Sequence, residues 1–173
     1  MEKACVHIYC GNGKGKTTAS VGLLTRASGA GKKCLLAQFL KTTPTSEIAS
    51  LTKLGVKCLR AESSIKKFIF AMNEEEKAQY SAEQKELFAE VCEEAKTQYD
   101  LIVMDEILDA VSLGLVSEDA LAELLTEKGD TEIVLTGRAP SEKIAQYADY
   151  YSRIEPVKHP YCEGLCARKG IEF

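Results

Sequence analysis

The sequence predicts an α/β fold in which helices flank a mostly parallel sheet. Three observations support this prediction. Strand-like apolar runs alternate with helical patterns along the chain. The segment "DLIVMDE" (residues 100–106) has the uninterrupted apolar run of a strand that is buried on both faces. A glycine-rich segment, "CGNGKGKTT" (residues 10–18), separates the first strand-like run from a helical pattern.

Each expected element has a local signal in the sequence. The strand-like runs cover residues 5–9, 34–40, 56–59, 101–104, 133–136 and 150–154. The expected helix ends are a capping box of Asn73 with Glu76 on a helix that reaches Thr97, N-caps at Ser117 and Ser141, and C′ glycines at Gly55 and Gly129. The least regular stretches, residues 41–44 and 61–72, could contain a functional loop.

Length and composition favour one soluble domain, residues 1–173. The chain has 173 residues and 45% apolar content, enough for one core. Its net charge of −4 and scattered basic residues argue against broad contact with nucleic acid or a membrane surface. No secretory start and no run of about 18 apolar residues is present, so we expect a cytoplasmic protein whose seven cysteines are reduced.

The glycine-rich segment closely matches a phosphate-binding P-loop. Gly15, Lys16 and Thr17 fit the end of the pattern, but Cys10 stands where the first glycine is usual. Backbone amides, a helix N-terminus and a lysine together favour phosphate binding. The expected nucleotide-binding residues are Gly11, Asn12, Gly13, Lys14, Gly15, Lys16, Thr17 and Thr18. A glycine-rich turn without a ligand is the alternative.

The carboxylates that follow the "LIVM" run predict a Mg²⁺ site beside the P-loop. Asp105 and Glu106, together with the Thr17 hydroxyl, are the expected metal ligands. In a hydrolase, Glu106 would instead activate water, and a third interpretation is that the two carboxylates cap the next helix. Arg138 follows the strand-like run before "TGR" and suits a phosphate oxygen, with a surface salt bridge as its alternative.

Four segments together resemble the cob(I)alamin adenosyltransferases of the corrinoid-salvage type, a family with a RecA-like P-loop fold. These segments are "GNGKGKTT", "VMDE", "LTGR" and the C-terminal "PVKHPYCEGLCARKGIEF". The resemblance covers nearly the whole chain, and the family lacks the same first glycine. It implies transfer of the 5′-deoxyadenosyl group of Mg·ATP to the Co(I) of a reduced corrinoid, with release of triphosphate. It also implies a homodimer and a reduced flavoprotein as electron donor.

The resemblance also implies roles for individual residues. Lys16, Lys14 and Arg138 would face a triphosphate that lies along the loop in the reverse direction. Phe68 and Phe70 match two aromatic residues that press on the lower face of the corrin, although packing in the core is the alternative for this pair. His159 would lie near the corrinoid or the triphosphate; a metal site with Cys162 and Cys166 is its alternative.

The chain departs from the family pattern in three ways, which concern the affinity and enclosure of the corrinoid more than ATP binding. Phe70 stands where Trp is common, Glu155 stands where Arg is frequent, and little sequence precedes the first strand. Two other functions therefore stay open. One is a P-loop NTPase or small-metabolite kinase with Glu106 as the base, and the other is a nucleotide- or corrinoid-binding carrier without enzyme activity.

Overall fold

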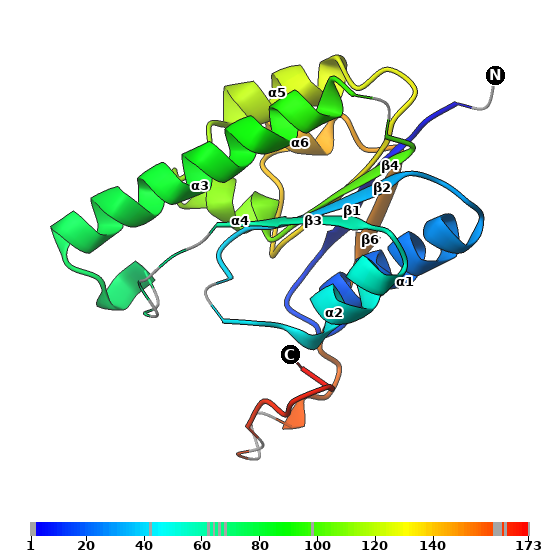
Figure 1. The fold of residues 1–173 in the computed structure, drawn as a ribbon. Helices are drawn as coiled ribbons and strands as arrows, with labels where there is room; N and C mark the ends of the chain where they lie inside the picture. Colours follow the sequence, from blue (N-terminus) through cyan, green and yellow to red (C-terminus); the bar gives the residue numbers. More distant parts are fainter. Residues whose placement is uncertain are drawn as a thin grey trace.

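Six parallel strands form one sheet, in the order β3-β2-β4-β5-β1-β6 (Figure 1). The computed structural model describes residues 3–41, 43–61, 63, 65, 67, 69–97, 99–160, 164 and 166–172. The strands are β1 (Val6–Cys10), β2 (Cys34–Gln38), β3 (Lys57–Arg60), β4 (Leu101–Asp105), β5 (Glu132–Thr136) and β6 (Tyr150–Arg153). This arrangement confirms the predicted α/β class.

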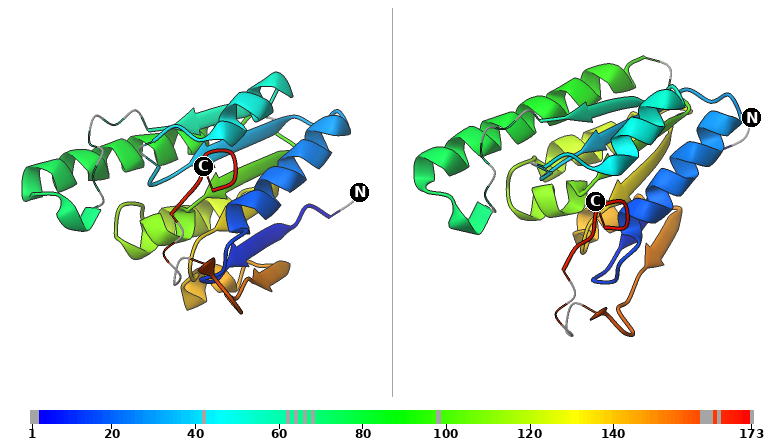
Figure 2. Two further views of the ribbon diagram at one scale, coloured as in Figure 1. Left: turned by 90° about the horizontal axis from the view of Figure 1, so that it is seen from below. Right: turned by 60° about the horizontal axis from the view of Figure 1, so that its bottom comes forward.

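Helices cover both faces of the sheet (Figures 1 and 2). The helices are α1 (Lys16–Gly29), α2 (Ser46–Lys53), α3 (Glu74–Ala95), α4 (Ile107–Ser112), α5 (Glu118–Thr126) and α6 (Glu142–Ala145), with a 3₁₀ turn η1 (Ile69–Ala71). Helices α1 and α2 pack on one face, and α3 to α6 on the other. Alternate residues of β4 therefore enter two cores, which explains its continuous apolar sequence: Ile102 and Met104 belong to one core, Leu101 and Val103 to the other.

Most of the predicted element ends are confirmed. Asn73 and Glu76 form the reciprocal capping box, although α3 ends at Ala95, two residues before the expected Thr97. The hydroxyls of Ser117 and Ser141 accept the expected capping bonds. Gly55 occupies the C′ position after α2, with φ of 78°. Gly129 also has positive φ but lies one residue beyond C′, because α5 already ends at Thr126.

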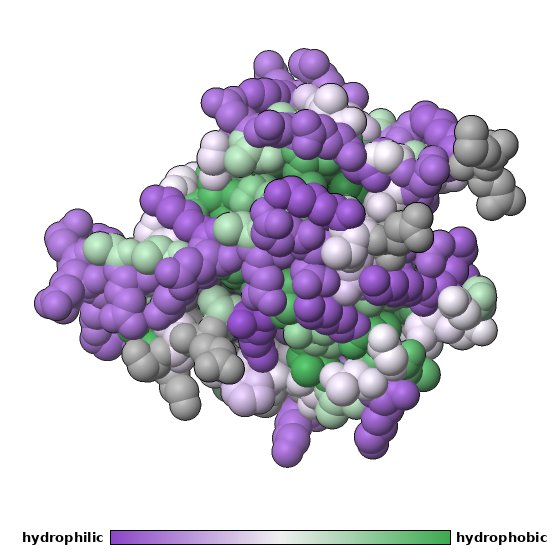
Figure 3. Space-filling view, turned by 45° about the horizontal axis from the view of Figure 1, so that its top comes forward, coloured by the Kyte–Doolittle hydropathy of each residue, from purple (hydrophilic) through white to green (hydrophobic). Residues whose placement is uncertain are grey.

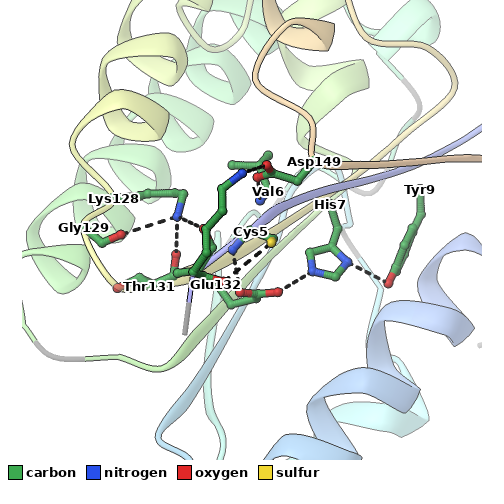
Figure 4. A network of polar contacts seen from close by, with 11 residues as sticks. Cys5, Val6, His7, Tyr9, Lys128, Gly129, Thr131, Glu132 and Asp149 are labelled. Atoms are coloured by element: carbon green, nitrogen blue, oxygen red, sulfur yellow. Dashed lines mark hydrogen bonds and ion pairs between the residues drawn. The ribbon is translucent and has the colours of Figure 1, made fainter. Parts of the chain in front are cut away.

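Polar side chains join the amino ends of β1, β5 and β6, away from the glycine-rich loop (Figure 4). Glu132 accepts a hydrogen bond from the Cys5 amide at 2.7 Å and lies 2.6 Å from His7 Nε2. Asp149 accepts one from the Val6 amide at 2.9 Å. These contacts satisfy backbone groups at the start of β1 and fix its register against its neighbours. We assign this network to the fold.

Charged side chains cover much of the outer surface of the helices, while apolar side chains show between them (Figure 3). One hollow, between α3 and α5, is a cavity of about 350 Å³ whose lining includes Cys92, Ala95, Ile102, Ala120 and Leu124. Within the described residues, no helix is both long and apolar enough to cross a membrane.

Candidate nucleotide site

The loop between β1 and α1 is anchored on the end of β6. The Gly13 amide donates to the Ile154 carbonyl at 2.8 Å, and the Ile154 amide donates to the Cys10 carbonyl at 2.8 Å. A Cβ atom at Gly13 would lie 2.8 Å from the Ile154 oxygen, and one at Gly11 would clash with the same oxygen. Both positions therefore require glycine.

The same geometry shows how the loop accommodates Cys10 where the P-loop pattern usually has its first glycine. Residue 10 is the last residue of β1 and is buried, so the strand continues through it. The chain turns one residue later, at Gly11, where φ is 110°. In this loop the left-handed turn thus follows Cys10 and needs glycine at position 11 rather than at position 10.

Two lysines lie in the loop and are held differently. Lys16, the first residue of α1, donates from Nζ to the Gly13 carbonyl at 2.9 Å and so stays against the loop. Lys14 Nζ instead pairs with Glu172 of the C-terminal segment at 2.6 Å. The first amides of α1 have no partner in a preceding turn and give this end of the helix a positive potential. The loop therefore combines the features of an anion-binding site.

Asp105, the last residue of β4, is the centre of a buried hydrogen-bond cluster. Its side chain is completely buried, and its Oδ1 accepts from the hydroxyls of Thr17 at 2.9 Å and Thr136 at 2.7 Å. Thr17 belongs to the first turn of α1, Thr136 to β5 and Asp105 to β4, so the cluster joins three elements. Thr17 and Asp105, two of the expected metal ligands, are thus in contact, whereas the contribution of Thr136 was not predicted.

The other oxygen of Asp105 contacts two residues that the sequence interpretation missed. Lys41 Nζ lies 3.0 Å from Oδ2, and Gln38 Nε2 lies 3.4 Å from the same atom. Lys41 belongs to the irregular stretch 41–44, one of the two stretches that the sequence offered as places for a functional loop. No periodicity or motif points to Lys41 itself, because its position depends on the path of the chain after β2.

Glu106 follows Asp105 in a left-handed conformation, with φ of 63°. Its amide donates to the Thr136 hydroxyl at 2.9 Å, and it occupies the N-cap position of α4. Burial, reinforced by the charges of Asp105 and Asp109, raises the pKa of Glu106 to about 7, although Lys41 acts in the opposite direction. A carboxyl in this state changes its charge near neutral pH.

Arg138 follows β5 at the same edge of the sheet, as predicted, but its guanidinium is engaged in an ion pair. Its Nε donates to Asp109 Oδ1 at 2.7 Å, and its amide donates to Asp109 Oδ2 at 2.8 Å. The side chain is 72% exposed. The salt-bridge alternative is therefore what the structure shows. The Arg138 carbonyl also accepts from the Gly11 amide at 2.8 Å and supports the loop.

Phe70 and His159 make none of the contacts of this cluster. Phe70 is in η1 and is 84% exposed, which contradicts the core-packing alternative for this residue. Phe68 and Cys162 lie outside the described residues. His159 is partly buried in the segment after β6. Within the described residues, no three His, Cys, Asp or Glu side chains converge on a metal position.

The donor atoms around Asp105 suit Mg²⁺ in the company of phosphate. Hydroxyl and carboxylate oxygens are the ligands that this ion prefers, and it commonly uses only one or two carboxylates, with phosphate oxygens and water completing the shell. Thr17 donates a hydrogen bond to Asp105, and the Glu106 carboxyl is close enough to Asp105 for their charges to interact, so these three residues provide such oxygens near one another. The residues therefore fit the metal.

A parallel sheet with a glycine-lysine loop after β1 and an aspartate at the end of the central strand β4 defines a P-loop nucleotide-binding protein. The family model "ATP:corrinoid adenosyltransferase BtuR/CobO/CobP" matches residues 2–173. The chain therefore belongs to the ATP:corrinoid adenosyltransferase family, and the resemblance that the sequence motifs indicated is confirmed.

Similar proteins from three bacterial sources carry the same activity in their names. The corrinoid adenosyltransferase of Escherichia coli (strain K12) is 30% identical over 175 residues, which cover 99% of this chain and 87% of that protein. The corrinoid adenosyltransferase CobA of Salmonella typhimurium (strain LT2) is 30% identical over 179 residues, with the same coverage. A corrinoid adenosyltransferase of Sinorhizobium sp is 28% identical and covered to 81% of its length.

Proposed function

We propose that this chain, acting as one domain, transfers the 5′-deoxyadenosyl group of Mg·ATP to the Co(I) of a reduced corrinoid. The observation that carries the proposal is the match of residues 2–173 to the family of ATP:corrinoid adenosyltransferases. In this reaction an electron pair of Co(I) forms the bond to C5′ of ATP. The C5′–O bond breaks, and triphosphate leaves with the electrons of that bond.

The chemistry requires positioning and charge compensation, because Co(I) needs no base to activate it. Lys16 and the amides at the start of α1 would stabilise the leaving triphosphate, and Lys14 would join them when it exchanges Glu172 for phosphate. Asn12 and Thr18 would complete the phosphate contacts. Arg138 would contribute if its guanidinium moves from Asp109 to a phosphate oxygen.

Thr17, Asp105 and Glu106 would hold Mg²⁺, which when bound offsets the negative charge of the triphosphate. Asp105 orients the Thr17 hydroxyl, since it accepts its hydrogen bond at 2.9 Å. Phe68 and Phe70 would contact the lower face of the corrin, and His159 would lie beside the corrinoid or the triphosphate. The exposed position of Phe70 supports a ligand contact for that residue.

Three further proposals follow from the family. The electron donor is a reduced flavoprotein, the working unit is a homodimer, and the protein acts in the cytoplasm. Light scattering during gel filtration tests the dimer directly, and a mass of one chain would contradict it. To test the electron donor, the protein is mixed with a Co(II) corrinoid and a reduced flavoprotein, and the absorption spectrum of the corrinoid shows whether Co(II) is reduced.

ATP hydrolysis is the second candidate, because a pKa of about 7 suits Glu106 as a general base. One experiment separates the two functions. The protein is incubated with ATP, Mg²⁺ and chemically reduced cobalamin, and the phosphate product is identified. Triphosphate with a light-sensitive Co–C product supports adenosyl transfer, whereas orthophosphate that forms without corrinoid supports hydrolysis.

Removal of the Lys16 charge tests the proposed phosphate site. We expect Lys16→Ala to lower the rate about 10²- to 10³-fold, because a contact to the leaving group is lost. Lys32→Ala is the matched control, since Lys32 pairs with Asp100 rather than with any loop residue. Near-normal turnover of folded Lys16→Ala would exclude Lys16 from the mechanism.

A further inference from the structure

Lys41 places a positive charge directly on the most buried carboxylate of the site. Its Nζ lies 3.0 Å from Asp105 Oδ2, while the side chain of Asp105 is fully buried and that of Lys41 is 22% exposed. An ion pair so far removed from water interacts more strongly than a surface pair. Lys41 is therefore the resident counter-ion of Asp105.

The backbone around Lys41 is built to hold it there. Leu40 has φ of 59°, and Leu40 and Glu106 are the non-glycine residues with positive φ within the described part of the chain. Such a conformation persists only where its surroundings enforce it. Here the Leu40 amide donates to the buried Gln84 Oε1 at 3.0 Å, and the Lys41 carbonyl accepts from Arg60 Nε at 3.2 Å.

Lys41 also borders the phosphate loop. Together with Thr17 and Thr18 it lines a cavity of about 320 Å³, to which the start of α2 and the C-terminal residues 170–172 contribute. Asp105, which its ammonium contacts, also accepts the hydrogen bond of Thr17 and directly precedes Glu106 in the chain. Lys41 thus lies beside the proposed metal site.

We propose that Lys41 is a positioning residue that couples metal binding to nucleotide binding. This inference rests on the proposed function, in which Thr17, Asp105 and Glu106 hold the metal. A divalent cation that arrives alone must displace the Lys41 ammonium from Asp105 and leave it beside a second positive charge. Phosphate groups that arrive with the metal give the ammonium a new anionic partner, so the metal binds well only together with the nucleotide.

Binding of Mn²⁺, followed by electron paramagnetic resonance, tests this coupling without any measurement of adenosyl transfer. In the absence of nucleotide, we expect Lys41→Gln to bind Mn²⁺ about tenfold more tightly than the wild type, because the competing charge is gone. Gln can still donate a hydrogen bond to Asp105. Lys41→Arg keeps the charge and should bind Mn²⁺ as weakly as the wild type.

The control is Lys57→Gln, since Lys57 pairs with Glu94 and should leave Mn²⁺ binding unchanged. With ATP present, the advantage of Lys41→Gln should disappear or reverse. Thermal melts of each variant are recorded first, with Lys41→Met as a second neutral substitution. Loss of the fold in both neutral variants would overturn the proposal, because it would make the role of Lys41 structural.

Two outcomes distinguish a failure of the proposed role of Lys41 from a failure of the proposed metal site. If the wild type binds Mn²⁺ with ATP but the neutral variants gain no affinity without ATP, the role of Lys41 is overturned and the metal site stands. If the wild type binds no Mn²⁺ even with ATP, the metal assignment is overturned and the coupling fails with it.

Discussion

Left-handed backbone occurs at two non-glycine residues next to the buried aspartate. Glu106 follows Asp105 directly, and Leu40 precedes the lysine that pairs with it. Each such residue carries a cost of roughly 1–2 kcal/mol relative to an ordinary conformation. The fold tolerates this cost where it brings a lysine and two carboxyl groups together, which is typical of functional sites.

The raised pKa of Glu106 predicts a stability that depends on pH. In the folded protein the Glu106 carboxyl keeps its proton up to about pH 7, whereas in the unfolded chain the carboxyl loses its proton near pH 4.5. The contribution of Glu106 to the free energy of unfolding is therefore fully present below pH 4.5 and is lost as the pH rises through 7. The difference in pKa corresponds to about 3 kcal/mol.

Glu106→Gln removes this titration, because the amide stays neutral. In EDTA, we expect the variant to gain stability relative to the wild type as the pH rises from 5 to 8, measured as urea midpoints at both values. Glu90→Gln on the exposed face of α3 is the control and should show no such trend. An advantage of Glu106→Gln that is equal at both pH values would contradict the assigned pKa.

At the scale of elements, the phosphate loop is supported from two sides. The end of β6 contacts it through Ile154, and the C-terminal segment contacts it through Glu172. Figures 1 and 2 show this last segment, in red, returning toward the starts of α1 and α2. The loop therefore depends on residues that lie some 140–160 positions later in the chain.

Gly13→Ala tests the contact with β6. The added Cβ would lie 2.8 Å from the Ile154 oxygen and 2.9 Å from the Glu155 carbonyl carbon, which are backbone atoms. We expect a loss of about 1–3 kcal/mol in unfolding free energy and weaker ATP binding. Gly22→Ala in α1 is the control: its Cβ would meet no atom within 4 Å, so alanine should stabilise the helix by about 0.5–1 kcal/mol. Equal melting temperatures for the two variants would contradict the clash.

Glu172→Gln tests the contact with the C-terminal segment. Hydrogen bonds from Arg168 and then Lys14 lower the pKa of Glu172 to about 2, so the carboxylate is ionised across the ordinary pH range. Removing its charge should loosen the turn, and trypsin should then cleave after Arg168 or Lys169 about threefold faster or more. Mass spectrometry of the digest measures this. Glu142→Gln is the control and should leave the cleavage rate unchanged. An unchanged rate in Glu172→Gln would show that the ion pair does not hold the C-terminal segment.

Sequence reasoning was accurate where the signal is local. The strands have apolar runs, Asn73 and Glu76 are three residues apart, and the loop has its glycines and lysine in one segment. Lys41 and Glu172 were missed because their contacts depend on the folded path. Lys41 reaches Asp105 only through the turn at Leu40, and 158 positions separate Lys14 from Glu172. The sequence prediction placed Arg138 at the correct edge of the sheet, but no residue near it in the sequence indicates Asp109 as its partner.

At the scale of the whole molecule, the parallel sheet brings the proposed functional residues to one end. Asp105, Thr136 and the loop after Cys10 all lie at carboxyl ends of strands. Helix α3 extends beyond this edge, so η1 with Phe70 lies on the same side of the molecule (Figures 1 and 2). A corrinoid on this side could therefore approach both the aromatic residue and the nucleotide.

Phe70→Ala tests this arrangement. The ring is 84% exposed, so its removal should change the unfolding free energy by less than about 0.5 kcal/mol. ATP affinity should also stay unchanged, because the phosphate contacts come from residues 11–18. If the ring excludes the lower ligand of cobalt, activity should fall with Co(II) and a reductant, and recover in part with preformed Co(I).

Two controls make this last result specific. Leu54→Ala removes another exposed apolar side chain, at the end of α2, and should affect neither activity. Phe39→Ala removes a fully buried ring and should cost about 3–5 kcal/mol, with a parallel loss of every activity. A Phe70→Ala protein that melts like the wild type and is equally active with Co(II) and with Co(I) would remove Phe70 from the corrinoid site. A selective loss with Co(II) would instead place the aromatic turn before α3 at the step that reduces cobalt.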